Sequence, residues 1–170
     1  FTKSLSMSLN KPFIPINHLE AHVLSTSFNN NINYPHLVLL LTGGHTQIYL
    51  MNNSNNIELL GESIDDAVGE AFDKTAKMLK LSYPGGKEIE KMAKKGDEDS
   101  FNLPLPLVNE ENFNFSFSGI KTAINLLTKT NEIDIKFIRN VSASFQKTIA
   151  KLITTKLIRG IDILNNKNVF

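Results

Sequence analysis

Two histidines four residues apart are the side chains of this sequence best suited to chemistry. They are His18 and His22, in the stretch Asn-His-Leu-Glu-Ala-His. On an α-helix this spacing puts both imidazoles on one face, one turn apart, so two ring nitrogens can bind one metal ion. Two ligands do not complete a site, and two neutral nitrogens with a carboxylate from elsewhere would suit non-haem iron or zinc. The alternative is a pair of unliganded histidines on a surface helix.

Glu20 distinguishes this pair from the zinc-protease signature. In His-Glu-x-x-His the glutamate directly follows the first histidine. Glu20 instead stands two residues after His18, which is about 200° around a helix. It therefore cannot share the metal-facing side, and the pattern predicts metal ligands without a protease base.

A Gly-Gly pair is the second candidate site. Gly43 and Gly44 lie between Thr42 and His45-Thr46 and join two apolar segments. Glycine lets an anion approach the backbone closely, and the amides and threonine hydroxyls of such a turn can bind phosphate oxygens. Many Gly-Gly turns only connect two strands, and on the pattern alone this alternative stays open.

Three acidic residues form a third candidate. Asp66, Glu70 and Asp73 follow one another at spacings of four and three, so on a helix they lie near one face. Considered alone, this pattern favours a solvated helix face. In the same way, Pro84-Gly85-Gly86 predicts a turn, and Lys121 is expected to be exposed to solvent.

Hydrophobic periodicity supplies the elements that must position these residues. The predicted strands are residues 12–17, 37–42, 46–51, 57–60 and an alternating aromatic segment at 113–117, and a last strand is expected to begin at 168. The predicted helices are residues 1–9, 18–27, 63–81, 87–95, 120–128 and 141–164. We expect Ser63 to cap the helix at 63–81, with Asp65 and Asp66 in its first turn. Mixed strands and helices predict an α/β or α+β protein.

Composition narrows the possible functions. The chain has 170 residues, of which 41% are hydrophobic and 21% charged, with a net charge of +1 and no cysteine. The lack of cysteine excludes disulfides, cysteine-ligated zinc and a thiol nucleophile. The longest apolar run, at residues 37–41, is far too short to span a bilayer, and the first residues lack the pattern of a signal peptide. We therefore expect a cytoplasmic protein.

Five motifs in a fixed order carry a resemblance to a known family. They are Asn-His-Leu-Glu-Ala-His (17–22), Leu-Leu-Leu-Thr-Gly-Gly-His-Thr-Gln (39–47), Leu-Leu-Gly-Glu-Ser-Ile-Asp-Asp-Ala-Val-Gly-Glu-Ala-Phe-Asp-Lys (59–74), Tyr-Pro-Gly-Gly (83–86) and Phe-Ser-Phe-Ser-Gly-Ile-Lys-Thr (115–122). Together they resemble the bacterial tRNA adenosine threonylcarbamoyltransferases, TsaD, formerly described as O-sialoglycoprotein endopeptidases or glycoproteases. The resemblance covers nearly the whole chain.

The resemblance implies an α/β fold of the actin-like ATPase, sugar kinase and heat-shock ATPase type, with two lobes around a cleft. Residues 1–36 would be the tail of the N-terminal lobe, and residues 37–170 the N-terminal part of the second lobe. The implied activity is transfer of the threonylcarbamoyl group from threonylcarbamoyl-AMP to the exocyclic amine of an adenosine. This adenosine lies beside the anticodon of tRNAs that read codons beginning with A.

The resemblance also implies site residues and partners. His18 and His22 would hold one divalent metal per subunit, iron or alternatively zinc. The implied substrate-lining residues are Leu40, Leu41, Thr42, Gly43, Gly44, Asp73 and Gly86, and no catalytic side chain is assigned. The implied partners are tRNA, threonylcarbamoyl-AMP, a paralogous non-catalytic subunit and a small ATPase, with no membrane.

The chain departs from the family pattern at both ends. The family's initial phosphate loop is absent, and its third metal ligand, an aspartate near the C-terminus, is expected outside this chain. The sequence therefore predicts a fragment of the enzyme, and the main alternative is an inactive or partner-binding product. The older metalloprotease assignment conflicts with the position of Glu20, and a sugar kinase would have no use for the histidine pair.

Overall fold

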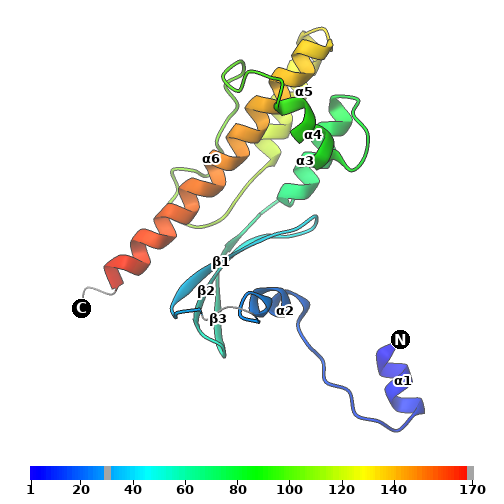
Figure 1. The fold of residues 1–170 in the computed structure, drawn as a ribbon, viewed down its shortest axis with the longest axis vertical. Helices are drawn as coiled ribbons and strands as arrows, with labels where there is room; N and C mark the ends of the chain where they lie inside the picture. The colour runs from blue at the N-terminus through cyan, green and yellow to red at the C-terminus, as the bar shows by residue number, and fades with distance from the viewer. Residues whose placement is uncertain (29–31, 168–170) are drawn as a thin grey trace. The chain divides into compact units, whose positions relative to one another are not determined.

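The computed structural model describes residues 1–28 and 32–167 and divides into two compact units, Phe1–Asn33 and Tyr34–Phe170 (Figure 1). The strand expected to begin at residue 168 lies outside the described residues. Within the described residues, no helix combines the length and the apolar character needed to cross a membrane. The assignment of residues 1–36 and 37–170 to two lobes remains a prediction.

The first unit contains two short helices, α1 (Thr2–Ser8) and α2 (His18–Ser25). Both were predicted, and both are confirmed. The strand predicted at 12–17 is wrong, because this segment has no strand partner and its apolar side chains are exposed, Ile14 at 85% and Ile16 at 75%. An isolated extended segment has no ladder to satisfy its amides, and its two prolines donate no hydrogen bond.

The second unit is built on a three-stranded antiparallel sheet in the order β1-β2-β3. The strands are β1 (His36–Leu41), β2 (Thr46–Asn53) and β3 (Asn56–Glu62). The predicted hairpin is confirmed, with Leu41 opposite Thr46 at its closed end. Every residue of β2 from Thr46 to Met51 is buried, as expected for the central strand.

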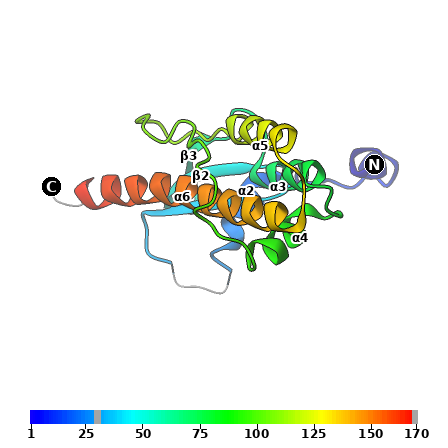
Figure 2. The same cartoon turned by 90° about the horizontal axis from the view of Figure 1, so that it is seen from above.

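Four helices complete the second unit. They are α3 (Val68–Met78), α4 (Gly85–Ala93), α5 (Ser118–Thr130) and α6 (Ile135–Lys167). Figures 1 and 2 show α3, α4 and α5 gathered around the N-terminal half of α6. Further along α6, a Cβ added at Gly160 would lie 2.6 Å from Leu37 Cδ1, so the helix packs closely on β1. Each helix was predicted, but α4 begins two residues earlier than expected and α6 six residues earlier. The turn predicted at Pro84-Gly85-Gly86 is therefore wrong for the two glycines, which are the first residues of α4.

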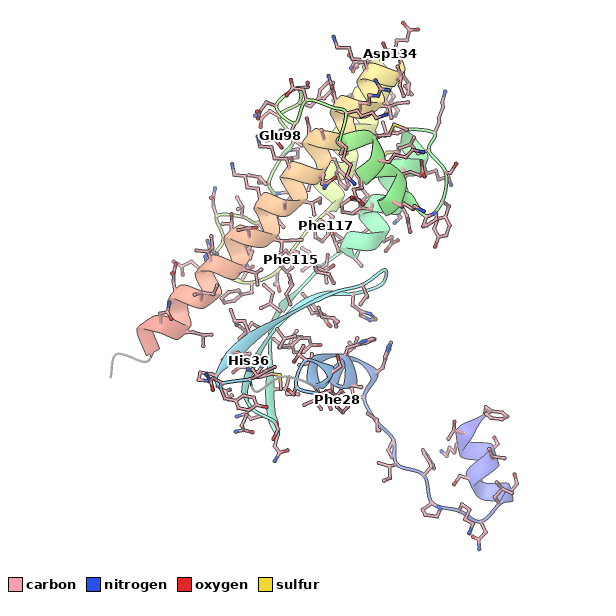
Figure 3. All side chains as sticks on the ribbon, in the orientation of Figure 1. Phe28, His36, Glu98, Phe115, Phe117 and Asp134 are labelled. Atoms are coloured by element: carbon pink, nitrogen blue, oxygen red, sulfur yellow. The ribbon has the colours of Figure 1, made fainter. Side chains whose placement is uncertain are left out.

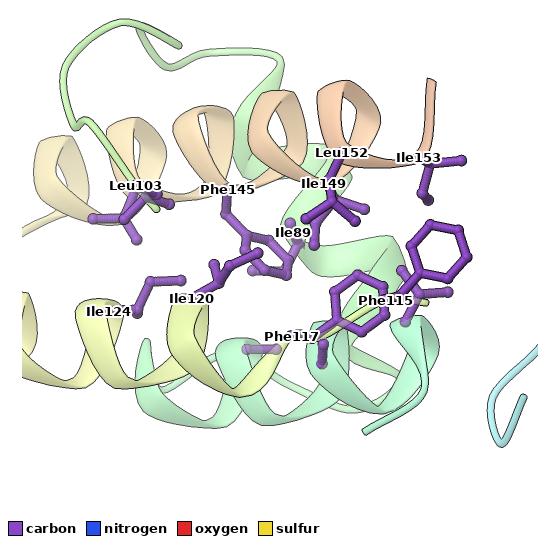
Figure 4. Close-up of a cluster of buried hydrophobic side chains, with 14 of the residues drawn as sticks. Ile89, Leu103, Phe115, Phe117, Ile120, Ile124, Phe145, Ile149, Leu152 and Ile153 are labelled. Atoms are coloured by element: carbon purple, nitrogen blue, oxygen red, sulfur yellow. The ribbon is translucent and has the colours of Figure 1, made fainter. Parts of the chain in front are cut away.

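The core of the second unit lies between these helices. Phe145 projects from α6 toward Ile120 of α5 and Ile89 of α4 (Figure 4). Its ring also meets Phe72 edge to face, with ring centroids 4.8 Å apart. Phe115 and Phe117 are fully buried and stack with an interplanar angle of 8° (Figure 3). The predicted aromatic face is therefore confirmed, but the strand at 113–117 is reduced to one parallel bridge between Ser63 and Phe115.

The helix predicted at 63–81 begins five residues later than expected. Ser63 does not cap it, because its hydroxyl donates to the Asp66 carbonyl and its backbone forms the bridge to Phe115. Asp65 is not in the first turn of α3. Its carboxylate instead accepts hydrogen bonds from the Phe117 amide at 2.8 Å and the Ser116 hydroxyl at 2.6 Å. A tertiary interaction therefore overrides the local helix signal.

The contact of Asp65 with residues 116–118, at the start of α5, can be tested by its pH dependence. Burial raises the pKa of Asp65, but the hydrogen bonds from Phe117, Ser116 and Ser118 outweigh burial and hold the pKa below its ordinary value. Asp65→Asn is expected to lower the free energy of unfolding by about 1 kcal/mol at pH 7, since charge-assisted bonds to helix-start amides are lost. The difference between the two proteins should persist above about pH 4 and close as the pH falls through the lowered pKa.

Urea unfolding of both proteins across this pH range measures the difference. Asp99→Asn is the control, because the Asp99 carboxylate forms an exposed ion pair with Lys147, and its loss should change the stability by less than about 0.5 kcal/mol. A difference between wild type and Asp65→Asn that stays constant down to pH 2 would show that the Asp65 charge does not stabilise this contact.

Candidate functional site

The histidine pair lies at the start of α2. The Asn17 side chain caps this helix by accepting hydrogen bonds from the Leu19 amide at 2.9 Å and the Glu20 amide at 3.2 Å. This cap fixes His18 as the first helical residue. His18 and His22 are both exposed, and their Nε2 atoms lie 2.9 Å apart. The predicted common face of the two imidazoles is therefore present.

This separation fits two ligands of one metal ion. Two nitrogens each about 2.05 Å from an ion and about 90° apart would be separated by about 2.9 Å. A hydrogen bond between the two imidazoles would give the same separation. No group of three or more metal-binding side chains is gathered within residues 1–28 and 32–167. The pair can thus supply two ligands to one ion.

The Gly-Gly turn closes the hairpin between β1 and β2. The Thr42 hydroxyl oxygen accepts the His45 amide at 2.9 Å and the Gly44 amide at 3.3 Å, and the Thr42 amide donates to the His45 carbonyl. The amides of Thr42, Gly44 and His45 are therefore engaged inside the turn, which the sequence did not indicate. Among the described contacts, Gly43 keeps the one uncommitted amide of residues 42–45. Gly43 and Gly44 are exposed, whereas Leu40 is buried in β1 and Leu41 is exposed beside the turn.

Helix α3 links this turn to the second Gly-Gly pair. A Cβ added at Gly69 would lie 2.8 Å from Gly43 Cα, so the first turn of α3 directly contacts the hairpin turn. One helical turn later, Asp73 Oδ1 accepts the Gly85 amide at 2.8 Å and so caps α4. Since residues four apart share a helix face, Gly69 and Asp73 hold the hairpin turn and the start of α4 along one side of α3.

A cavity of about 280 Å³ lies beside Asp73 and Gly85. It is also lined by residues of α3 and of the segment before α4: Lys74, Ala76, Lys77, Leu81, Ser82 and Tyr83. Gly86, beside it, has no atom within 4 Å of an added Cβ. The structure therefore brings together Thr42, Gly43, Gly44, Asp73 and Gly86 around one helix. His18 and His22 belong to the other compact unit.

The acidic residues in and just before α3 have specific partners. Asp66 pairs with Lys74 at 2.9 Å and with Lys121, and Lys74 also pairs with Glu70 at 2.6 Å. The expectation that Lys121 is solvent-exposed is wrong, because its side chain is only 20% exposed and connects α5 to Asp66. The solvated-face interpretation is also wrong for Asp66, whose side chain is 14% exposed.

Three positioning residues were missed in the sequence. Asn17 carries an available signal, because asparagine directly before a helix is a preferred cap. Thr46, whose hydroxyl accepts the Val68 amide at 2.8 Å, gave no signal, since its partner is 22 residues away. Gly69 likewise gave none, because glycine inside a helical pattern is uninformative without knowledge of what packs against it.

This chain is similar to a known family of proteins. The family model described as "TsaD: tRNA N6-adenosine threonylcarbamoyltransferase" matches residues 1–170. The curated protein of Rickettsia typhi named tRNA N6-adenosine threonylcarbamoyltransferase is 49% identical to this chain, over 95% of this chain and 42% of its own length. The protein of the same name from Rickettsia conorii is 49% identical, over 98% of this chain and 49% of its own length. The protein of the same name from Rickettsia bellii is 48% identical, over 96% of this chain and 48% of its own length.

The chain therefore spans about half the length of the curated relatives it matches. Its mixed helices and small antiparallel sheet are consistent with an incomplete α/β part of the actin-like ATPase fold of this family. The match over the whole chain, together with the sequence motifs that the structure places around α3, shows that this chain belongs to the TsaD family of tRNA N6-adenosine threonylcarbamoyltransferases.

Proposed function

We propose that this chain forms part of an enzyme that transfers a threonylcarbamoyl group from threonylcarbamoyl-AMP to an adenosine of tRNA. The observation that carries the proposal is the arrangement of the Gly43-Gly44 turn and the Gly85-Gly86 start of α4 along one face of α3, in a chain that matches the family over residues 1–170. The acceptor is the exocyclic amine of the adenosine beside the anticodon, in tRNAs that read codons beginning with A.

In this reaction the amine nitrogen attacks the carbamoyl carbon of the adenylate. A C–N bond forms, the bond from that carbon to the phosphate oxygen breaks, AMP leaves, and the amine loses one proton. The Gly43 amide, in an exposed residue, and the nearby N-terminus of α3 are suited to an anionic phosphate, because both present partial positive charge. They would stabilise the charge that grows on the leaving phosphate.

Asp73 and Gly86 would hold the nucleoside part of the adenylate. Asp73 Oδ1 is engaged by the Gly85 amide, which fixes the carboxylate and leaves Oδ2 to accept a ribose hydroxyl. The open space at Gly86 allows a ligand to approach the backbone. The adjacent cavity of about 280 Å³ lies near the lower limit of small-molecule sites.

His18 and His22 would hold one divalent metal, iron or alternatively zinc, with a carboxylate ligand from outside this chain. Their 2.9 Å nitrogen separation fits this role. When bound, the metal would supply a Lewis acid for an oxygen of the substrate. The Asn17 cap would keep both imidazoles in place by fixing the start of α2.

The proposal extends to partners and location. tRNA and threonylcarbamoyl-AMP are the substrates, and a paralogous non-catalytic subunit and a small ATPase are the protein partners. A cytoplasmic location follows from the tRNA substrate. A second candidate function is that of an inactive or partner-binding fragment of such an enzyme.

Complementation tests the proposal and separates the two candidates. We would express the 170-residue chain, and a chimera that adds the flanking segments of the Rickettsia typhi relative, in bacteria whose own transferase can be switched off. The proposal predicts that the chimera restores threonylcarbamoyladenosine in tRNA. Restoration by the chimera but not by the chain alone identifies the chain as an incomplete part. A chimera that accumulates in folded form and restores nothing contradicts the proposal.

A further inference from the structure

The contact between α3 and the hairpin turn is unusually close. A Cβ built on Gly69 would lie 2.8 Å from Gly43 Cα, 2.9 Å from the Thr42 carbonyl oxygen and 3.3 Å from the Gly43 nitrogen. All three atoms are backbone atoms, so no flexible side chain can move aside. Any residue larger than glycine at position 69 must therefore displace the turn or the helix.

The helix cannot easily retreat from this contact. The buried face of α3 includes Ala71 and Ala76, which pack in the core. Ala71 lies about 200° around the helix from Gly69 and is fully buried, so the side of α3 away from the turn is packed. Because protein interiors are close-packed, a side chain at Gly69 would shift the exposed turn rather than the packed helix.

A hydrogen bond fixes the same junction from the other side. The buried Thr46 hydroxyl, at the first residue of β2, accepts the Val68 amide at 2.8 Å. This bond satisfies one of the amides that a helix start leaves unpaired. Thr46 directly follows the Thr42–His45 turn in the chain. The residue that accepts the Val68 amide is therefore covalently attached to the turn.

We infer that Gly69 and Thr46 are positioning residues, which together set the Thr42–His45 turn against the N-terminus of α3 and so fix the site for the adenylate phosphate. The inference rests on the proposed function for its ligand. In this role both residues act through the turn rather than by binding the substrate. Gly69 permits the close approach, and Thr46 holds the register of the turn on the helix.

Gly69→Ala is the first test, and Gly119→Ala is its matched control. Both glycines are the second residue of a helix, but a Cβ at Gly119 would meet only Pro106 Cγ, at 3.2 Å. In the 170-residue chain, Gly69→Ala is expected to shift the NMR amide signals of Gly43 and Gly44, whereas Gly119→Ala should leave them in place. In the chimera, the KM for threonylcarbamoyl-AMP should rise about tenfold, because displacing a binding group by a fraction of an ångström weakens productive contacts.

Thr46→Val and Thr46→Ser form the second test. Valine removes the acceptor for the Val68 amide with little change in shape, whereas serine keeps the hydroxyl. The valine variant should shift the same turn signals and raise the KM several-fold, and serine should restore both. This pair also decides the inference if Gly69→Ala fails to fold.

The outcomes separate this inference from the proposed function. Unchanged turn signals in Gly69→Ala and Thr46→Val, or equal KM changes in Gly69→Ala and Gly119→Ala, overturn the positioning role. If the wild-type chimera forms no modified nucleoside, the proposed function fails. The turn signals, measured without any substrate, then still decide whether Gly69 and Thr46 position the turn.

Discussion

Replacing His18 or His22 by alanine in the chimera is expected to lower threonylcarbamoyl transfer about a hundredfold or more and to remove the bound metal. Each variant removes one of the two nitrogens that lie 2.9 Å apart at the start of α2. Loss of Lewis-acid stabilisation worth several kcal/mol corresponds to at least two orders of magnitude in rate. Metal analysis of the purified proteins, together with initial rates, measures both effects.

Glu20→Gln is the matched control for the histidine variants. Glu20 is exposed on the same helix, and its amide, not its carboxylate, takes part in the Asn17 cap. The transferase assignment predicts a rate within about threefold of wild type, since surface changes away from a site have small effects. The older protease assignment would require Glu20 as a base. Retained metal in a protein lacking both histidines would contradict the metal assignment. An inactive Glu20→Gln variant would contradict the absence of a catalytic role for Glu20.

Phe145→Ala is expected to produce the largest loss of stability. Phe145 is fully buried between α6, α4 and α5, and its ring meets Phe72 edge to face. Truncation of such a side chain removes its burial and leaves a cavity, which costs about 3–5 kcal/mol. That is a large part of the stability of a typical small domain, so the second unit should unfold at much lower urea concentration. Urea titration followed by circular dichroism measures the change.

Two further variants test the cause of that loss. Phe145→Leu keeps most of the apolar volume and should lose clearly less stability than Phe145→Ala. Leu126→Ala on α5 should change the free energy of unfolding by less than about 1 kcal/mol, because Leu126 is 62% exposed. A loss below 1 kcal/mol for Phe145→Ala would mean that the helices of the second unit do not share one packed core.

Local patterns in the sequence predicted the elements whose stability is local. The hairpin follows from two apolar segments around Gly43-Gly44, and α2, α5 and α6 follow from their helical periodicity. The strand predicted at 12–17 failed because alternation alone supplies no partner strand. The N-terminal end of α3 was misplaced because Asp65, which suits a helix start, bonds instead to the amide of Phe117, 52 residues away.

In the candidate site, too, some features could be predicted from the sequence and others depend on contacts that only the structure shows. The family resemblance implied Leu40 to Gly44, Asp73 and Gly86 as a substrate-lining set, and the structure places Thr42, Gly43, Gly44, Asp73 and Gly86 around α3. Sequence could not show that the Thr42 hydroxyl occupies two amides of its own turn, because that depends on side-chain geometry. Nor could it identify Gly69, whose importance lies only in the backbone that packs against it.

The most direct test of the central claim is transfer of labelled threonylcarbamoyl to tRNA by purified components. The chimera would be incubated with unmodified tRNA, its partner proteins, and threonylcarbamoyl-AMP made from isotopically labelled threonine, and the digested nucleosides would be analysed by mass spectrometry. We predict label on the adenosine beside the anticodon. Absence of label, in a parallel reaction where the complete Rickettsia typhi relative labels the same tRNA, would contradict the assignment.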